Sequence, residues 1–300
     1  EVGMSVTKLF RVVSAVFLAL GMWGAAGTAA PTASAAGVEM LMVPSAAMGR
    51  DIPVAFQGGG PHAVVLLDAF NAGPDVSNWV TAGNAMGALA GSGLSVAAPA
   101  GGAYSMYTNW ERNGSKQWET FLADELPNWL AANKGLAPNR HAIVGVSQGG
   151  TAAVTMATFH PDRYSYAGSL SGFLNPSDTQ TNGVISNAIN IGDNIDAMWG
   201  APQLGRWKWH DPNVHANLLV KNNTRLWVFS PMNFSCGDPA AMGGGDCSVA
   251  AGSNRIFYAH YRSLGGRNGH FDITGGGGHD WGTWAGQLGA MAGDISAALG

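Results

Sequence analysis

The sequence predicts an α/β fold in which helices cover both faces of a mostly parallel sheet of eight strands. Short apolar segments rich in β-branched residues recur along the 300-residue chain and alternate with longer segments of helical periodicity. The first two apolar segments are joined by a short turn, which is typical of adjacent strands. No Pro-rich or Ser-rich linker and no internal repeat divides residues 36–300, so we expect one domain there.

Each element follows from its local pattern. The strands are expected at the short apolar runs Glu39 to Val43, Arg50 to Phe56, Ala63 to Leu67, Leu94 to Ala98, Ala142 to Val144, Tyr166 to Ser169, Leu226 to Phe229 and Ile256 to Tyr261. The helices are expected between and after them, at Trp79 to Ala90, Trp118 to Ala132, Gln148 to His160, Val214 to Lys221 and Trp281 to Leu299. In the last helix, apolar residues recur at spacings of three and four, as on the buried face of a helix.

The fifth expected strand runs directly into a Gly-x-Ser-x-Gly motif, Gly145 to Gly149, and then into a helix of small residues. This context is typical of a nucleophile elbow, in which the flanking glycines permit a strained turn and a close approach of strand and helix. Ser147 is therefore the candidate nucleophile, and the predicted architecture is that of an α/β-hydrolase. The alternative is an ordinary strand-to-helix turn in which Ser147 caps the helix.

A serine nucleophile needs an imidazole to take its proton, and in this fold the histidine comes last in the chain. His279 follows the last predicted strand in a glycine-rich loop, directly before the final helix, and is the expected base. His270, in a turn just after the same strand, is the competitor. His160 at the far end of the elbow helix and His260 within the last strand are expected to be packed or surface residues.

The triad carboxylate must be an aspartate, because no glutamate follows Glu125. Asp238 is the expected acid, since it lies in the loop after the seventh strand. Asp246 shares that loop and is the runner-up, and both residues could instead form turns. For the oxyanion hole we expect two backbone N–H groups, that of Gln148 and that of Phe70 in the loop after the third strand. Alternatively, that loop simply forms a turn under the sheet edge.

The first 35 residues predict a signal peptide, with two basic residues, an apolar run from Val12 to Ala26 and an Ala-x-Ala site ending at Ala35. We expect an exported protein, secreted or in the cell envelope, with no stable membrane span. Cys236 and Cys247 are the only cysteines and could form a disulfide in an oxidising compartment, or remain free thiols. The net charge of −4 and the low content of charged residues argue against nucleic acid as a partner, and no metal-ligand spacing occurs.

Several segments in order resemble the antigen 85 family, the secreted mycolyltransferases and diacylglycerol acyltransferases of mycobacteria, and most closely its mycolyltransferase-like secreted-antigen paralogue without a working triad. They include Leu66-Leu67-Asp68, Gly93 to Val96, Trp118 to Leu122, Glu125-Leu126-Pro127, Met198-Trp199-Gly200, Asn222 to Val228 and Gly286-Gln287-Leu288. The stretch Gly265 to Asp272 is similar to that paralogue's, although the paralogue is expected to lack the serine and histidine present here.

The resemblance implies an α/β-hydrolase that moves mycolyl groups between trehalose esters and onto cell-wall sugars through an acyl-serine, with no cofactor. By position, Ser147 matches the family nucleophile and His279-Asp280-Trp281 its base motif, which makes Trp281 a substrate-binding candidate. Asp68 matches a trehalose-binding aspartate, but Asn71 stands where the family has an arginine. The family acid is a glutamate, one methylene longer than Asp238.

Two functions compete at this point. The first is a serine acyltransferase or esterase acting on trehalose mycolates or similar long-chain esters, with Ser147, His279 and Asp238 as the triad. The second is a catalytically weak or inactive hydrolase-like antigen that binds host matrix, fibronectin in particular, or small sugars. The second is motivated by the altered acid, the missing arginine and the run Trp207 to His210, which we expect to be exposed.

Overall fold

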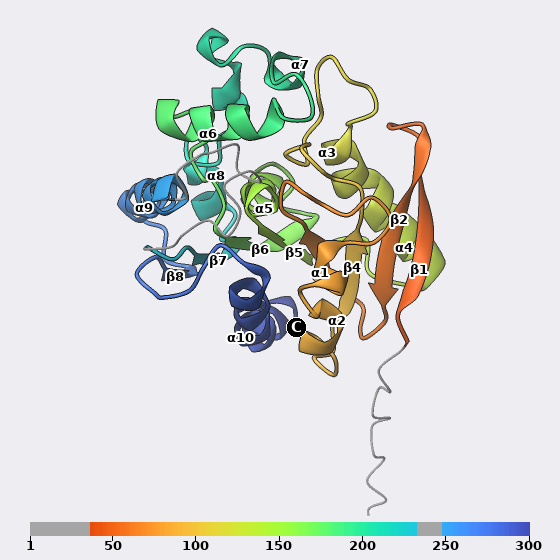
Figure 1. The fold of residues 1–300 in the computed structure, drawn as a ribbon. Helices are drawn as coiled ribbons and strands as arrows, with labels where there is room; N and C mark the ends of the chain where they lie inside the picture. The colour runs from red at the N-terminus through yellow and green to blue at the C-terminus, as the bar shows by residue number, and fades with distance from the viewer. Residues whose placement is uncertain (1–36, 233–247) are drawn as a thin grey trace, which may run out of the picture. The chain divides into compact units, whose positions relative to one another are not determined.

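The computed structural model describes residues 37–232 and 248–300, and the fold it shows is a single mixed sheet between two layers of helices (Figure 1). The strands of that part of the chain are β1 (Glu39–Ser45), β2 (Arg50–Gln57), β3 (Ala63–Leu67), β4 (Ser95–Pro99), β5 (His141–Val146), β6 (Tyr164–Leu170), β7 (Arg225–Phe229) and β8 (Gly269–Asp272). Their order in the sheet is β1-β2-β4-β3-β5-β6-β7-β8. The pairs β1/β2 and β2/β4 are antiparallel and the other neighbours are parallel, which confirms the predicted α/β-hydrolase architecture.

Helices cover both faces of this sheet. They are α1 (Asn78–Thr81), α2 (Ala85–Ala88), α3 (Trp118–Thr120), the π-helical turn η1 (Phe121–Glu125), α4 (Leu126–Lys134), α5 (Gln148–Phe159), α6 (Thr179–Ile189), α7 (Asp196–Trp199), the 3₁₀ turns η2 (Pro202–Leu204) and η3 (Arg206–His210), α8 (Ala216–Lys221), α9 (Ser248–Ser263) and α10 (Trp281–Leu299). Figure 1 shows α1, α2 and α10 on one face, and α3 to α5, α8 and α9 on the other. Each face buries its own apolar cluster against the sheet.

A third apolar cluster joins the loops at the carboxyl ends of the strands to α6 and α7. It contains Phe70 from the loop after β3, Met106 from the loop after β4 and Phe173 from the loop after β6. These side chains pack with Ile185 of α6 and Trp199 of α7. The segment from α6 to η3 therefore covers the end of the sheet at which α/β proteins bind ligands.

The predicted strand Ile256 to Tyr261 is wrong, because this segment is part of α9. Its β-branched and aromatic composition favours a strand locally, but its buried residues, Phe257 and Tyr261, are four positions apart. Ile256, which directly precedes Phe257, is 50% exposed. That period of four is helical, and the actual eighth strand is the short segment Gly269–Asp272.

Other departures are smaller. The helix predicted from Trp79 to Ala90 is broken into α1 and α2, because Gly83 packs against Trp79 and Asn84 has a left-handed φ of 45°. No helix was predicted for α6, α7 or α9. Within the described ranges, no helix is both long enough and apolar enough to cross a bilayer. The signal peptide and the domain boundary after residue 35 stay predictions.

Candidate active site

Ser147 lies between the end of β5 and the start of α5 in a strained backbone conformation, with φ of 54° and ψ of −119°. A positive φ is unfavourable for a residue with a Cβ, so the surrounding structure must impose it. The Ser147 amide donates to the Leu170 carbonyl of β6 at 2.9 Å, and the side chain is 1% exposed. Its Oγ makes no hydrogen bond with any residue that the structure describes, so Ser147 does not cap α5 with its side chain.

The glycines of the motif are required by close backbone approach. A Cβ placed on Gly149 would lie 2.5 Å from the Leu67 carbonyl oxygen and 2.7 Å from that of Asp68. A Cβ on Gly145 would lie 2.2 Å from the Gly149 carbonyl carbon. The first turn of α5 is therefore pressed against β5 and against the loop that follows β3.

That loop carries Phe70, the predicted source of one oxyanion amide. Among the described residues, neither the Phe70 amide nor the Gln148 amide at the start of α5 donates a hydrogen bond to a protein acceptor. The Gln148 side chain links this loop to the next one: its Nε2 donates to the carbonyls of Ala69 at 2.8 Å and Gly102 at 2.9 Å, and its Oε1 accepts from the Met106 amide at 3.0 Å. Two backbone donors thus lie next to the elbow, on segments joined by one side chain.

His279 lies in the loop between β8 and α10, as predicted, and its ring packs edge-on against Trp284 with the centroids 4.9 Å apart. The Trp284 Nε1 donates to the Ser171 Oγ at 3.3 Å, and Ser171 directly follows Leu170, to which the Ser147 amide is bonded. His279 and Ser147 are therefore connected through consecutive contacts at the carboxyl ends of β5 and β6. Burial lowers the pKa of His279 from 6.5 to about 4, against the opposing charge of Asp280, so the imidazole is neutral at pH 7.

Two aspartates shape the loop that carries this histidine. The Asp272 carboxylate accepts from the amides of Thr274 at 3.3 Å and Gly275 at 2.9 Å, which closes a turn directly after β8. Asp280 is the N-cap of α10 and accepts from the Thr283 amide at 2.9 Å. The position of His279 is thus fixed by a turn on one side and a helix cap on the other.

The predicted acid Asp238, its runner-up Asp246 and the cysteines Cys236 and Cys247 lie outside the described residues. Asp68, the expected sugar ligand, is fully buried. Its carboxylate accepts from the Ser77 hydroxyl and from the amides of Asn78 and Trp79 at 2.9 to 3.1 Å.

Burial raises the pKa of Asp68 to about 7, although these hydrogen bonds oppose the shift. The three hydrogen bonds that the Asp68 carboxylate accepts all come from Ser77 and the first two residues of α1. Trp281 is partly buried and packs edge-on against Trp79 and Trp284. That either residue binds substrate stays a prediction.

The remaining histidines occupy packed or paired positions. His160 ends α5 and its Nε2 lies 2.9 Å from Glu119, a contact that lowers the pKa of that carboxyl. His260 is in α9 rather than in a strand, and its Nδ1 lies 2.9 Å from the Asn213 carbonyl oxygen, to which it can only donate. His270, expected in a turn, is in β8 and stacks on Trp227 with the centroids 4.0 Å apart.

The run Trp207 to His210 is only partly exposed, which corrects the expectation from sequence. Trp207 is buried and its Nε1 donates to the Gly200 carbonyl at 3.1 Å. His210 stacks on Trp199 with the centroids 4.4 Å apart. Only Trp209 presents its indole to solvent, with 63% of it exposed.

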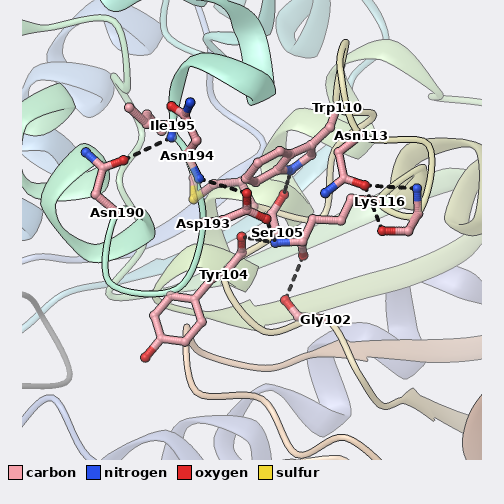
Figure 2. A network of polar contacts seen from close by, with 12 residues as sticks. Gly102, Tyr104, Ser105, Trp110, Asn113, Lys116, Asn190, Asp193, Asn194 and Ile195 are labelled. Carbon is pink, nitrogen blue, oxygen red and sulfur yellow. Dashed lines mark hydrogen bonds and ion pairs between the residues drawn. The ribbon is translucent and has the colours of Figure 1, made fainter.

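Sequence reasoning missed a polar network that fastens the loop after β4 to the segment between α6 and α7 (Figure 2). Lys116 pairs with Asp193 at 2.8 Å, donates to the Tyr104 carbonyl at 3.1 Å and lies 4.2 Å from the Trp110 ring centroid. The Trp110 Nε1 donates to the Ser105 carbonyl at 2.8 Å. No local pattern marks Lys116, because its charged partner, Asp193, lies far away in the chain, and Tyr104 and Trp110 come from its own loop.

Comparison with known proteins agrees with this geometry. The esterase family model matches residues 45–295. The chain is 64% identical over 295 residues to the MPT51/MPB51 antigen of Mycobacterium tuberculosis, an alignment that covers 98% of each protein. It is 43% identical over 284 residues to the diacylglycerol acyltransferase/mycolyltransferase Ag85B of Mycolicibacterium smegmatis, covering 88% of this chain and 86% of that protein.

Solved structures agree as well. The crystal structure of M. tuberculosis MPT51 (FbpC1) superposes with a TM-score of 0.86 at 66% identity, over 88% of this chain and 100% of that one. FphF, a fluorophosphonate-binding serine hydrolase of Staphylococcus aureus, shares the fold with a TM-score of 0.67 at 14% identity, over 87% of this chain and 98% of that one. The chain therefore belongs to the antigen 85 family, in which it is similar to the MPT51-type antigens.

Proposed function

We propose that this protein is an exported serine acyltransferase or esterase that acts on trehalose mycolates or related long-chain esters. The observation that carries the proposal is the strained Ser147, whose Oγ makes no hydrogen bond within the described chain and whose elbow packs against the loop that carries Phe70. In that part of the chain the backbone amides of Phe70 and Gln148 donate to no protein acceptor. The acyltransferase name of the Ag85B relative supports the same class of reaction.

The reaction would proceed in two steps. The Ser147 Oγ attacks the ester carbonyl while His279, neutral at pH 7, takes the hydroxyl proton, and the amides of Phe70 and Gln148 bind the oxyanion. The C–O bond of the ester breaks, the sugar alkoxide leaves with the proton from His279, and an acyl-serine remains. A hydroxyl of a second sugar, or water, then attacks the acyl-serine with its proton passing through His279. Asp238 is the proposed partner that orients the imidazole.

The test is an acyl-exchange assay with trehalose monomycolate, together with labelling by a fluorophosphonate probe. Wild type should label and exchange acyl groups, and Ser147→Ala should do neither. Ser165→Ala is the matched control, because the Ser165 Oγ is also buried and makes no hydrogen bond to the described residues, but lies at the opposite end of β6. Absence of labelling in the wild type, or equal labelling of Ser147→Ala, contradicts the proposal.

A second candidate function is recognition of host matrix or small sugars by the exposed indole of Trp209. Arg206 lies 5.9 Å from its ring centroid, so an aromatic and a cationic group are presented together. Trp209→Ala should weaken binding to immobilised fibronectin without changing acyl exchange. Ile191→Ala removes an exposed apolar side chain elsewhere in the same segment and is the control. Equal binding by wild type and Trp209→Ala rejects this surface.

A further inference from the structure

The Gln148 side chain is fully buried and held in one orientation by three hydrogen bonds. Its Nε2 faces two carbonyl oxygens, of Ala69 and Gly102, and its Oε1 faces the N–H of Met106. Rotating the amide by half a turn would place oxygen against both carbonyls and nitrogen against the N–H. All three contacts would then become repulsive, so the side chain has a single stable orientation.

One of these bonds determines the direction of an oxyanion donor. The Ala69 carbonyl and the Phe70 N–H belong to the same peptide group, and in a planar trans peptide these two point in opposite directions. Because Gln148 Nε2 holds the carbonyl at 2.8 Å, the Phe70 N–H must point away from the Gln148 side chain. The Phe70 carbonyl is held as well, since it accepts from the Tyr104 amide at 3.0 Å.

Neighbouring contacts remove the remaining freedom of this loop. The Asp68 amide donates to the Tyr107 hydroxyl at 3.0 Å, two peptide groups before the Ala69 carbonyl that Gln148 holds. The other two Gln148 contacts hold Gly102 and Met106, and Met106 and Tyr107 have left-handed φ values of 52° and 48°. Such conformations persist only where surrounding contacts impose them, and the Gln148 Oε1 supplies one of these contacts.

We propose that the Gln148 side chain is a positioning residue that aims the Phe70 amide into the oxyanion hole. One residue then serves both halves of the hole: its backbone N–H is one donor and its side chain orients the other. The inference rests on the proposed function and adds to it the residue that prepares the oxyanion site before substrate arrives.

The variants are Gln148→Met, which removes all three bonds at similar size, and Gln148→Glu, which keeps the acceptor for Met106 but turns oxygen toward two carbonyls. Thr158→Val is the matched control, because it removes a buried bond on the same helix, from the Thr158 Oγ1 to the Val154 carbonyl at 2.7 Å. All proteins are assayed under conditions in which circular dichroism shows them folded.

The main measurement is the hydrolysis of a p-nitrophenyl ester and of its thionoester, in which sulfur replaces the carbonyl oxygen and accepts hydrogen bonds poorly. We expect Gln148→Met to lower kcat for the oxygen ester by about 100-fold with little change in KM, as for loss of an oxyanion donor. The ratio of oxygen-ester to thionoester rates should fall, in Gln148→Glu as well, and should stay constant in Thr158→Val. An equal loss of rate on both esters, or an unchanged kcat in Gln148→Met, overturns the proposal.

A second measurement does not depend on turnover, so it separates this proposal from the proposed function. The amide resonance of ¹⁵N-phenylalanine at position 70 should broaden and exchange faster with solvent in Gln148→Met than in wild type or Thr158→Val. If the wild type proves inactive and this resonance responds as expected, the proposed function fails while the positioning role stands. A Phe70 amide that is unaffected by Gln148→Met overturns the positioning role.

Discussion

His141 should make the protein less stable in mild acid. It is the first residue of β5, its side chain is 1% exposed, and its Nδ1 accepts from the Ala63 amide at 3.0 Å. Burial lowers the pKa of His141 from 6.5 to about 4, with smaller contributions in the same direction from the charges of His62 and Arg163. The folded protein therefore holds this imidazole neutral over a pH range in which the unfolded chain protonates it.

The sign follows from proton linkage. Between pH 6.5 and 4 the unfolded state binds more protons than the folded state, so the stability contributed by neutral His141 is present above pH 6.5 and is lost as the pH falls toward 4. Integrating between these two pKa values gives a loss of about 2 kcal/mol in the free energy of unfolding from pH 7 to pH 5. That is a large part of the stability of an ordinary domain.

The assay is urea unfolding of wild type and His141→Gln at pH 7 and pH 5. Glutamine can still accept from the Ala63 amide but does not titrate in this range. The drop in unfolding free energy between the two pH values should be about 2 kcal/mol smaller in His141→Gln than in wild type. His279 contributes equally to both proteins, so its contribution cancels in this comparison. Equal drops in wild type and His141→Gln would refute the reasoning.

Three further outcomes are expected. Gly149→Ala should lower the free energy of unfolding by about 2 kcal/mol or more, because its Cβ meets two backbone carbonyls, and urea titration measures this. Ser147→Gly should be more stable than Ser147→Ala by about 1 kcal/mol in the same titration, because only glycine adopts the φ of 54° without strain; equal stabilities would exclude that strain. Asp294→Asn should cost about 1–3 kcal/mol in thermal unfolding, because Asp294 accepts two bonds from Arg225 and one from the Tyr166 hydroxyl; an unchanged midpoint would contradict this.

Elements whose cause is local were predictable from the sequence. The apolar run Ala63–Leu67 is a fully buried central strand, and α10 has the predicted bounds because its apolar spacing is regular. The segment Gly269–Asp272 has no strand pattern of its own, and it forms a strand because it pairs with β7 at the end of the sheet. The opposite error, a strand predicted in place of part of α9, has its cause in the β-branched and aromatic composition of this segment, which favours a strand although Phe257 and Tyr261 have helical spacing.

The candidate site divides in the same way. The elbow at Ser147 could be predicted because the glycines on either side of the serine are needed for the close approach of strand and helix, and they are visible in the sequence. The contacts of Asp68 could not, since family resemblance indicates a position in the chain and not which way a carboxylate points. Nor could the role of the Gln148 side chain be predicted, because its partners lie 42 to 79 residues away and only the fold brings them together.

The long sequence separations joined at Gln148 also bear on how the protein reaches its working state. A fragment starting at β5 contains the serine, both glycines and the helix, but none of the three backbone groups that this glutamine holds. Contacts so distant in the chain close late, after local helices have formed. During refolding from urea, far-ultraviolet ellipticity should therefore recover before ester turnover. The delay between the two signals would measure how long the loops after β3 and β4 take to pack around the elbow.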